Sequence, residues 1–394
     1  MLLVVLFAAS AAGADHQPPD DNQWQGTPAA TLPARVGRIS VRGRWFVDEL
    51  GRVRLFHGFN DVGEAKGTGP FTGRNYLPLI LTSNQSRVTQ LVDEYGFNCF
   101  RIMASWAAVQ PTPDLVPDTA YTAALRNATK MLGASGAFTL LDMHQDSLSS
   151  RFGTCTAWPN GCSDYDGAPL WLVNRTVARH PYPWPWAANS SGISGQITEA
   201  EGQAWEDLYR NAHGGLTAWA AAWKSFASVF KAEKGIVGYE LFNEPWAGDV
   251  YKDPLLFLPG VAGHRSLQPA YDRLAEAIRE VDTETTILFE PMTWGMIKAP
   301  NGTPVSKLLD SGFEHVPGGS QWANRSAYSF HYYCWAAQSH KNDSSQKPYD
   351  PVTRQECDGT NGLGQSVFHA VDATMSHIGG ASFMTEFGGI FFDP

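Results

Sequence analysis

Two glutamates follow apolar segments that are typical of buried strands, Glu244 in LFNEPW and Glu386 in FMTEFGG. Cleavage of a glycosidic bond needs two carboxyl groups, one protonated for the leaving oxygen and one anionic to face the anomeric carbon. In an enzyme that retains the anomeric configuration, the two groups lie about 5 to 5.5 Å apart. We therefore predict Glu244 as acid/base and Glu386 as nucleophile, on the condition that folding brings these distant positions together.

Further polar side chains stand within or after the other apolar segments. Arg101 in FNCFRIM is expected to keep Glu386 anionic, because a nearby positive charge lowers the pKa of a carboxyl group. Tyr333 is expected to hydrogen-bond Glu386. His144 and His331 are expected to line the cleft, where they would orient the carboxylates or bind sugar hydroxyls.

The residues around the first glutamate carry two more expectations. Asn243 should donate its side-chain amide to the sugar 2-hydroxyl or to the nucleophile, a bond that strengthens in the transition state. Glu290 repeats the Glu-Pro pair without the preceding asparagine, so it either supports the site from behind or only resembles the Glu244 position. No metal or organic cofactor is expected, because two carboxylates suffice and no histidines or cysteines have zinc-ligand spacing.

The elements that must position these residues follow an α/β pattern. Short apolar runs alternate with helical stretches, which predicts a parallel sheet of the (β/α)8 (TIM) barrel type, with the site at the carboxyl ends of the strands. The expected strands are 53–59, 97–103, 137–143, 236–242, 285–289, 327–332 and 381–386. The expected helices are 120–133, 216–233 and 267–281.

The two ends of this pattern carry their own expectations. Alternation over 38–48, a turn at 49–52 and the run at 53–59 predict an N-terminal β-hairpin that leads into the barrel. Only seven barrel strands are counted before Pro394, whereas a closed barrel needs eight. We expect the chain to be cut before or within the eighth strand; a strand count that is wrong by one is the alternative.

Several motifs together resemble glycoside hydrolase family 5. They are Arg101, Asp142-Met143-His144, Asn243-Glu244-Pro245, His331-Tyr332-Tyr333 and Thr385-Glu386-Phe387-Gly388. Within that family the chain is similar to the endoglycoceramidases, on the evidence of a second set of motifs. These are Lys66 in DVGEAKGTG, Met143-His144-Gln145-Asp146, Gly167-Ala168-Pro169-Leu170-Trp171 and Asn243-Glu244-Pro245-Trp246.

The resemblance implies a retaining hydrolase that cuts the β-glycosidic bond between the oligosaccharide and the ceramide of a glycosphingolipid. It also implies contacts to the sugar from Lys66, Asp146 and Trp171. The C-terminal β-sandwich and the eighth-strand tryptophan of these enzymes are missing from the sequence. Another family 5 β-glycanase (glucanase, mannanase or cellulase) and an inactive, truncated carbohydrate-binding barrel are the alternatives.

The N-terminus and the sequons predict passage through the secretory pathway. Residues 1–14 combine an apolar run with a small-residue cleavage pattern, which predicts a signal peptide; a buried strand is the alternative. Residues 15–37 form a polar, Pro-rich lead-in, and 38–394 form the catalytic domain. Seven N-x-S/T sequons favour a secreted or lysosomal glycoprotein.

Cysteines and charge complete the picture. We expect local disulfides between Cys155 and Cys162 and between Cys334 and Cys357, with Cys99 free in a buried strand; other pairings stay open. The net charge of −10 argues against a nucleic-acid partner. We expect a monomer whose partner is a glycolipid or carbohydrate substrate.

One aromatic segment, residues 179–187 (RHPYPWPWA), has two readings. It is either an aromatic loop packed against the protein or an exposed apolar lip. A lip would contact the ceramide or the membrane surface, where tryptophan and tyrosine are favoured.

Overall fold

The structure, a computed structural model, is built around one parallel sheet. It describes residues 36–61, 64–65, 76–78, 80, 84–152, 167–187, 195–292, 311–333, 355, 357, 359 and 362–388. Lys66, Cys155, Cys162 and Cys334 therefore lie outside the described residues, as do the predicted signal peptide and nearly all of the lead-in.

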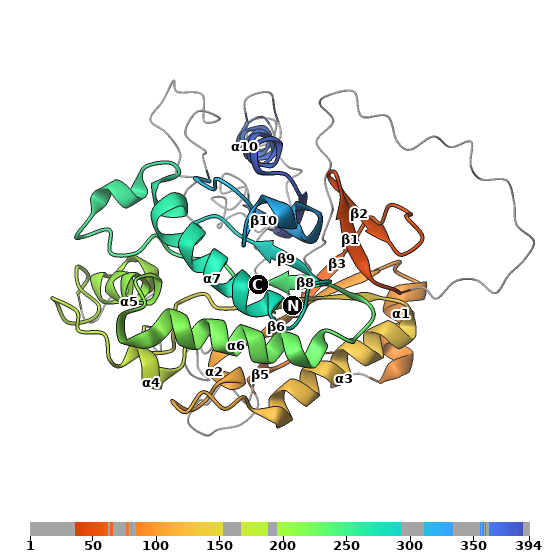
Figure 1. Cartoon of the computed structure of the whole chain (residues 1–394), viewed down its shortest axis with the longest axis horizontal. Helices are drawn as coiled ribbons and strands as arrows, with labels where there is room; N and C mark the ends of the chain where they lie inside the picture. The colour runs from red at the N-terminus through yellow and green to blue at the C-terminus, as the bar shows by residue number, and fades with distance from the viewer. Residues whose placement is uncertain are drawn as a thin grey trace, which may run out of the picture.

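Seven parallel strands form a nearly closed barrel in the order β11-β10-β9-β8-β7-β6-β3 (Figure 1). Their bounds are β3 (Gly58–Asp61), β6 (Cys99–Ala104), β7 (Phe138–Met143), β8 (Ile236–Glu240), β9 (Thr286–Phe289), β10 (Ser326–Tyr333) and β11 (Ala381–Gly388). The expected (β/α)8 fold class is confirmed, and each of the seven predicted strands overlaps an observed one. A further two-stranded sheet pairs β4 (Glu64–Ala65) with β5 (Tyr76–Leu77).

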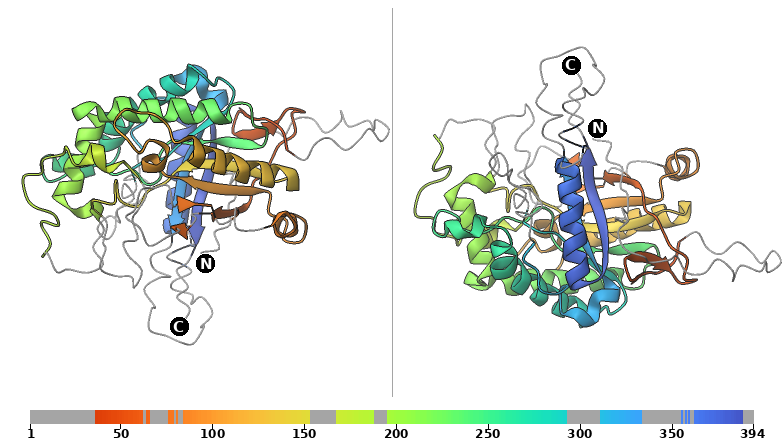
Figure 2. Two further views of the ribbon diagram at one scale, coloured as in Figure 1. Left: turned by 90° about the horizontal axis from the view of Figure 1, so that it is seen from below. Right: turned by 90° about the horizontal axis from the view of Figure 1, so that it is seen from above.

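Helices cover the outside of the sheet (Figure 1). The longer ones are α1 (Gln85–Asp93), α3 (Thr119–Ser135), α5 (Glu199–Tyr209), α6 (Gly215–Phe230), α7 (Gln268–Arg279) and α10 (Leu363–Ile378). The three helices expected from the sequence correspond to α3, α6 and α7. Helix α10 lies alongside β11 (Figure 2), so the βα alternation continues to the last described strand.

The N-terminal hairpin exists, but its predicted strand boundaries are wrong. Strands β1 (Ile39–Arg42) and β2 (Trp45–Asp48) pair within the segment that we expected to be a single strand. The chain reverses at Gly43, whose φ of 59° suits a residue without a Cβ. The predicted second strand contributes only one bridge, from Val53 to Val47, before the barrel begins at Gly58.

The hairpin closes one end of the barrel with apolar side chains. Phe46 packs against Phe56 and Phe383, with ring centroids 5.5 and 5.7 Å apart. The same cluster contains inward-facing residues from β6, β7, β8, β9, β10 and β11, namely Cys99, Leu140, Val237, Leu288, Ala327 and Phe383. This apolar layer excludes water from that end of the barrel. Polar residues further along the same strands therefore pack against an apolar surface without water.

Within the residues that the structure describes, no helix combines the length and the apolar character needed to cross a bilayer. Residues 389–394, where an eighth strand would start, lie outside the described part of the chain.

Candidate active site

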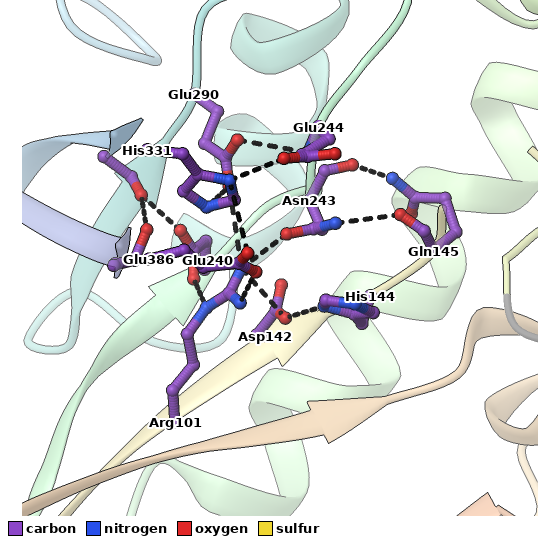
Figure 3. Close-up of polar contacts among 12 residues, drawn as sticks. Arg101, Asp142, His144, Gln145, Glu240, Asn243, Glu244, Glu290, His331 and Glu386 are labelled. Carbon is purple, nitrogen blue, oxygen red and sulfur yellow. Dashed lines mark hydrogen bonds and ion pairs between the residues drawn. The ribbon is translucent and has the colours of Figure 1, made fainter. Parts of the chain in front are cut away.

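Above the apolar layer, the strands present a layer of buried polar side chains. In a strand, side chains two positions apart point to the same face. One step beyond the apolar layer, that rule reaches the buried residues Arg101, Asp142, Glu290, Ser329 and Thr385. In β8 the pairing with β7 shifts by one residue, which brings the buried Glu240, rather than Tyr239, opposite Asp142. The carboxylates gather around the one guanidinium group of this layer (Figure 3).

Arg101 is the centre of this cluster. Its Nε donates to Glu240 Oε2 at 2.5 Å, and a terminal nitrogen donates to Glu386 Oε1 at 2.6 Å. The other terminal nitrogen donates to Asn243 Oδ1 at 2.8 Å and lies 3.0 Å from Asp142 Oδ2. Burial opposes the charge of Arg101, but the surrounding carboxylates raise its pKa well above the usual value. The guanidinium therefore stays charged and fixes the geometry of the groups around it.

Glu386 owes its inward position to a bulge in β11. The pairing of β10 with β11 shifts by one residue, so that Phe330 lies opposite Met384 while His331 lies opposite Glu386. The shift lets Thr385 and Glu386 both reach inward, since Thr385 Oγ1 lies 2.5 Å from Ser329 Oγ. Without this extra residue, strict alternation would turn the Glu386 side chain away from the barrel interior.

Glu386 is held as an anion by its surroundings. As expected, Tyr333 donates its hydroxyl to Glu386 Oε2 at 2.7 Å, and Arg101 contacts the other oxygen. Burial acts to raise the pKa of Glu386, but His331, Arg101 and His144 outweigh it and lower the pKa to about 2. At neutral pH this carboxylate is charged and carries a free lone pair.

Glu244 follows β8 and faces Glu386. One carboxylate oxygen of each residue and a ring nitrogen of His331 all lie within 4.8 Å of one another. His331 Nδ1 is 2.8 Å from Glu244 Oε1 and 3.6 Å from Glu386 Oε2. The side chain of Glu244 is 25% exposed and that of Glu386 is 12% exposed. The two glutamates thus meet at an opening that solvent reaches.

The two expected histidines both contact carboxylates. His331 bridges the glutamates as described, and His144 Nδ1 lies 2.6 Å from Asp142 Oδ2. Burial acts to lower the pKa of His144, but Asp142 raises it to about 10. His144 is therefore an imidazolium at neutral pH and adds positive charge on the β7 side of the site.

Asn243 is oriented differently from one of our expectations. Its amide nitrogen donates to the Gln145 carbonyl at 2.9 Å, and its oxygen accepts from Arg101. The predicted bond from Asn243 to the nucleophile is therefore wrong for this structure, because Arg101 occupies the position between them. The alternative expectation, a bond to the sugar 2-hydroxyl, stays a prediction.

Two further predicted contacts, Asp146 and Trp171, lie at or beyond the edge of this cluster. Asp146 is exposed, and its charge acts on His144. Trp171, on α4 (Leu170–Val173), is half-buried and donates its indole N–H to the Gln110 carbonyl at 3.1 Å. None of the contacts among the described residues joins Trp171 to the Arg101 cluster. Lys66 lies outside the described residues.

The cysteines agree with the part of the prediction that the structure describes. Cys99 is free and buried on β6. Cys357 is disulfide-bonded, and the other three cysteines lie outside the described residues.

One acidic member of the cluster, Glu240, was not singled out from the sequence. Glu240 is fully buried, bonded to Arg101 and to the Ser329 hydroxyl. A signal was present, because an acidic residue inside the apolar run IVGYELF needs a buried cation or donor as its partner. Glu290, for which two readings were open, lies inside the site. Its Oε2 accepts the backbone N–H of Glu244 at 3.1 Å.

Two sets of ligand atoms are close enough together to hold a metal ion. They are Glu240, Glu290 and His331, and Glu244, His331 and Glu386. The members of both sets already form ion pairs with Arg101 or with His331. The expectation of metal-free chemistry stays a prediction.

An apolar pocket opens beside Glu244. Glu244, Glu290 and His331 form its polar end, and the rest of its wall is mostly apolar, including Leu258, Met292, Phe330, Val367 and Val371. The pocket and its open mouth together enclose about 740 Å³ of empty space, part of which is open solvent.

A parallel αβ barrel with two facing carboxylates at the carboxyl ends of its strands is the arrangement found in glycoside hydrolases that use paired carboxylates. The chain belongs to glycosyl hydrolase family 5, since the family model described as cellulase (glycosyl hydrolase family 5) matches residues 64–394. The resemblance predicted from the motifs is confirmed.

Relatives and solved structures agree with this assignment. The chain is 37% identical to an endoglycoceramidase of Cyanea nozakii over 303 residues, which cover 75% of this chain and 56% of the relative. It is 35% identical to an endoglycoceramidase of Hydra vulgaris over 312 residues, covering 75% and 55%. The chain thus spans just over half the length of these relatives. The ganglioside GM3 complex of endo-glycoceramidase II from Rhodococcus sp. shares the fold with a TM-score of 0.63 and 20% identity, over 86% of this chain and 68% of that one.

Proposed function

We propose that the chain hydrolyses the bond between the oligosaccharide and the ceramide of glycosphingolipids, with retention of configuration. The observation that carries the proposal is the approach of one carboxylate oxygen of Glu244 to one of Glu386, within 4.8 Å. This separation suits a retaining double displacement, because an inverting enzyme needs about 6.5 to 9.5 Å to fit a water molecule.

In the proposed reaction, Glu386 attacks the anomeric carbon while Glu244 gives its proton to the leaving oxygen of ceramide. Glu244 then takes a proton from water, which hydrolyses the glycosyl-enzyme bond and restores both carboxyl groups. The pKa of Glu386, lowered to about 2, supports its role as the anion. Tyr333 and Arg101 hold that anion in place, and His331 holds Glu244.

The apolar pocket supports a lipid leaving group over a second sugar. The leaving group departs on the side of the acid, and the pocket begins at Glu244 and continues along Leu258, Phe330 and Val367. A glucan, mannan or cellulose chain would place hydroxyl groups there, which lose hydrogen bonds to water without gaining partners. The names of the relatives agree with this choice.

Product analysis on lactosylceramide tests the function. Intact lactose and ceramide are expected, with the β-anomer formed first by NMR, and no comparable activity on carboxymethylcellulose. Glu244→Gln and Glu386→Gln should each abolish the release. Stepwise release of single sugars, or cleavage of the cellulose derivative at a similar rate, would contradict the proposal.

We also propose that the aromatic segment 179–187 forms a lip that contacts lipid. Trp184 and Trp186 are 37% and 44% exposed. The segment is held rigid from behind, because Glu199 accepts the backbone N–H groups of Arg179 and His180. Replacing both tryptophans with serine should reduce activity on lactosylceramide in vesicles at least fivefold more than activity on a soluble aryl lactoside. An equal loss on both substrates would contradict a lip.

A secreted or lysosomal monomeric glycoprotein is the setting that we propose. Four of the sequon asparagines, Asn84, Asn127, Asn174 and Asn324, are exposed and accessible to glycans. The disulfide at Cys357 supports an oxidising compartment. Expression in cultured animal cells, followed by endoglycosidase treatment, tests this setting. A decrease in the apparent mass of the protein after treatment is expected.

A further inference from the structure

Glu290 touches Glu244 by two routes. Its Oε2 accepts the backbone N–H of Glu244 at 3.1 Å. Its Oε1 lies 3.2 Å from His331 Nε2, and the other ring nitrogen of His331 is 2.8 Å from Glu244 Oε1. Figure 3 shows the three side chains grouped together above Arg101, with dashed lines joining Glu244 to both Glu290 and His331. One buried carboxylate therefore contacts both the main chain of Glu244 and the group that orients its side chain.

The backbone of Glu244 needs such a support. Its φ is +43°, in the left-handed region that residues with a Cβ rarely adopt. A residue in that region keeps its conformation only where the surrounding structure holds it. Glu290 is 2% exposed and sits directly after β9, so it forms a fixed point against which the Glu244 peptide is held.

The distances from Arg101 show that Glu290 interacts less with the residues that hold the nucleophile than Glu240 does. Arg101 is 3.6 Å from Glu290 Oε1, whereas it binds Glu240 and Glu386 at 2.5 and 2.6 Å. Glu290 thus contacts mainly Glu244 and His331, whereas Glu240 contacts mainly Arg101, which holds the nucleophile. Of the two buried glutamates, Glu290 therefore positions the acid and Glu240 positions the arginine beside the nucleophile.

We propose that Glu290 is a positioning residue for Glu244, which sets the direction in which the acid delivers its proton. This inference rests on the proposed function only in taking Glu244 as the acid. A substrate whose leaving group needs protonation, such as the alkoxide of ceramide, depends on that direction. A substrate with a leaving group that departs as a stable anion depends on it much less.

The test compares lactosides of increasing leaving-group ability, because kcat/KM reports the glycosylation step. Glu290→Gln keeps an acceptor for the Glu244 N–H and removes the titratable carboxyl group beside His331, whereas Glu290→Ala removes both the acceptor and the carboxyl group. We expect Glu290→Ala to lower kcat/KM for phenyl lactoside by about 30- to 100-fold, just below the range of about 10²- to 10⁴-fold for general acid catalysis, because Glu244 itself is still present. The loss for 2,4-dinitrophenyl lactoside should be at least tenfold smaller.

Azide gives a second readout that a purely structural role would not change. It should raise kcat of Glu290→Ala on the dinitrophenyl substrate and give the β-lactosyl azide, because azide needs no base. Glu240→Gln is the matched control, and it should lower kcat/KM equally for both leaving groups. Thermal unfolding of each variant checks that the fold is kept, and Glu290→Gln serves where Glu290→Ala does not fold.

The possible outcomes separate this inference from the proposed function. Equal losses for both leaving groups in the folded Glu290 variants, or no loss at all, would overturn the positioning role. A wild-type enzyme that cleaves aryl lactosides but not lactosylceramide would overturn the lipid substrate alone, and the leaving-group comparison would still decide the role of Glu290.

Discussion

Replacement of Tyr333 with phenylalanine tests how the site keeps its nucleophile charged. The hydroxyl of Tyr333 donates to Glu386 Oε2 at 2.7 Å, and Arg101 donates to Oε1 at 2.6 Å. The Arg101 contact is buried and the Tyr333 contact is partly buried, with 12% of the Glu386 side chain exposed. The substitution removes one of these two donors and keeps the ring in place.

The expected size of the effect follows from the hydrogen bond. A bond to a charged group is worth about 1.5 to 3 kcal/mol, and one pKa unit corresponds to about 1.4 kcal/mol. Loss of the bond should therefore raise the pKa of Glu386 by about one to two units from its value of about 2. Since only the deprotonated nucleophile reacts, activity falls as the pH drops through this pKa. The acidic limb of kcat/KM should move up to a pH of about 3 to 4.

The assay is the rate of release of dinitrophenolate from its lactoside between pH 3 and pH 7, followed after quenching in alkali. Tyr332→Phe is the control, because the Tyr332 hydroxyl donates to the Cys357 carbonyl and lies on the same strand. Dilution back to pH 6 separates titration from irreversible unfolding. An acidic limb of Tyr333→Phe that coincides with those of the wild type and Tyr332→Phe would refute the reasoning.

Three further changes should affect stability. Arg101→Met leaves several buried carboxylates without a cation and should lower the free energy of unfolding by about 3 to 5 kcal/mol in urea titrations; a loss below about 1 kcal/mol would contradict the central role of Arg101. Gly58→Ala would put its Cβ 1.6 Å from the Cys99 carbonyl oxygen and should prevent accumulation of folded protein, whereas Gly133→Ala, with a nearest contact at 3.9 Å, should be tolerated. His144, whose pKa the neighbouring carboxylates raise to about 10 against the effect of burial, contributes stability that is complete below about pH 6.5 and is lost as the pH rises toward 10. The wild type should therefore lose more unfolding free energy between pH 6.5 and pH 9.5 than His144→Gln does, and equal losses would contradict this assignment.

Most of the barrel could be predicted because its strands are buried on both faces. Such strands appear in sequence as short apolar runs, and their carboxyl ends meet at one edge. From that reasoning we could predict that Glu244, Glu386, His331 and Tyr333 lie close together, although positions 244 and 386 are almost 150 residues apart in sequence. It worked because each of these residues is near the end of a strand, where small errors in a boundary do not change its place.

Residues inside the strands were harder to assign. Glu240 lies within a run of apolar letters, and only the position of Arg101 two strands away explains its burial. The hairpin boundaries were wrong because the turn at Gly43 lies inside a segment whose alternation continues without a break. The partner of Glu240 is distant in sequence, so the apolar run shows that a partner is needed but not which residue supplies it. The hairpin turn is local, but the unbroken alternation around Gly43 gives no sign of it.

For Glu386 the sequence pattern predicted the right residue, but the physical reason for its inward position is a bulge in β11 that the pattern does not contain. Counting in steps of two from Phe383 leads inward to Thr385 and outward to Glu386, yet the register shift between Phe330 and His331 brings Glu386 opposite His331 and toward Arg101. The inward place of the nucleophile thus depends on one unpaired residue. In this register Arg101 donates to Glu386, so the ion pair that keeps the nucleophile charged also favours the bulge. A β11 strand without the bulge would gain one regular position in the β-ladder but would lose the buried ion pair between Arg101 and Glu386. Because an unpaired buried charge costs more than one ladder position gains, the bulge is favoured.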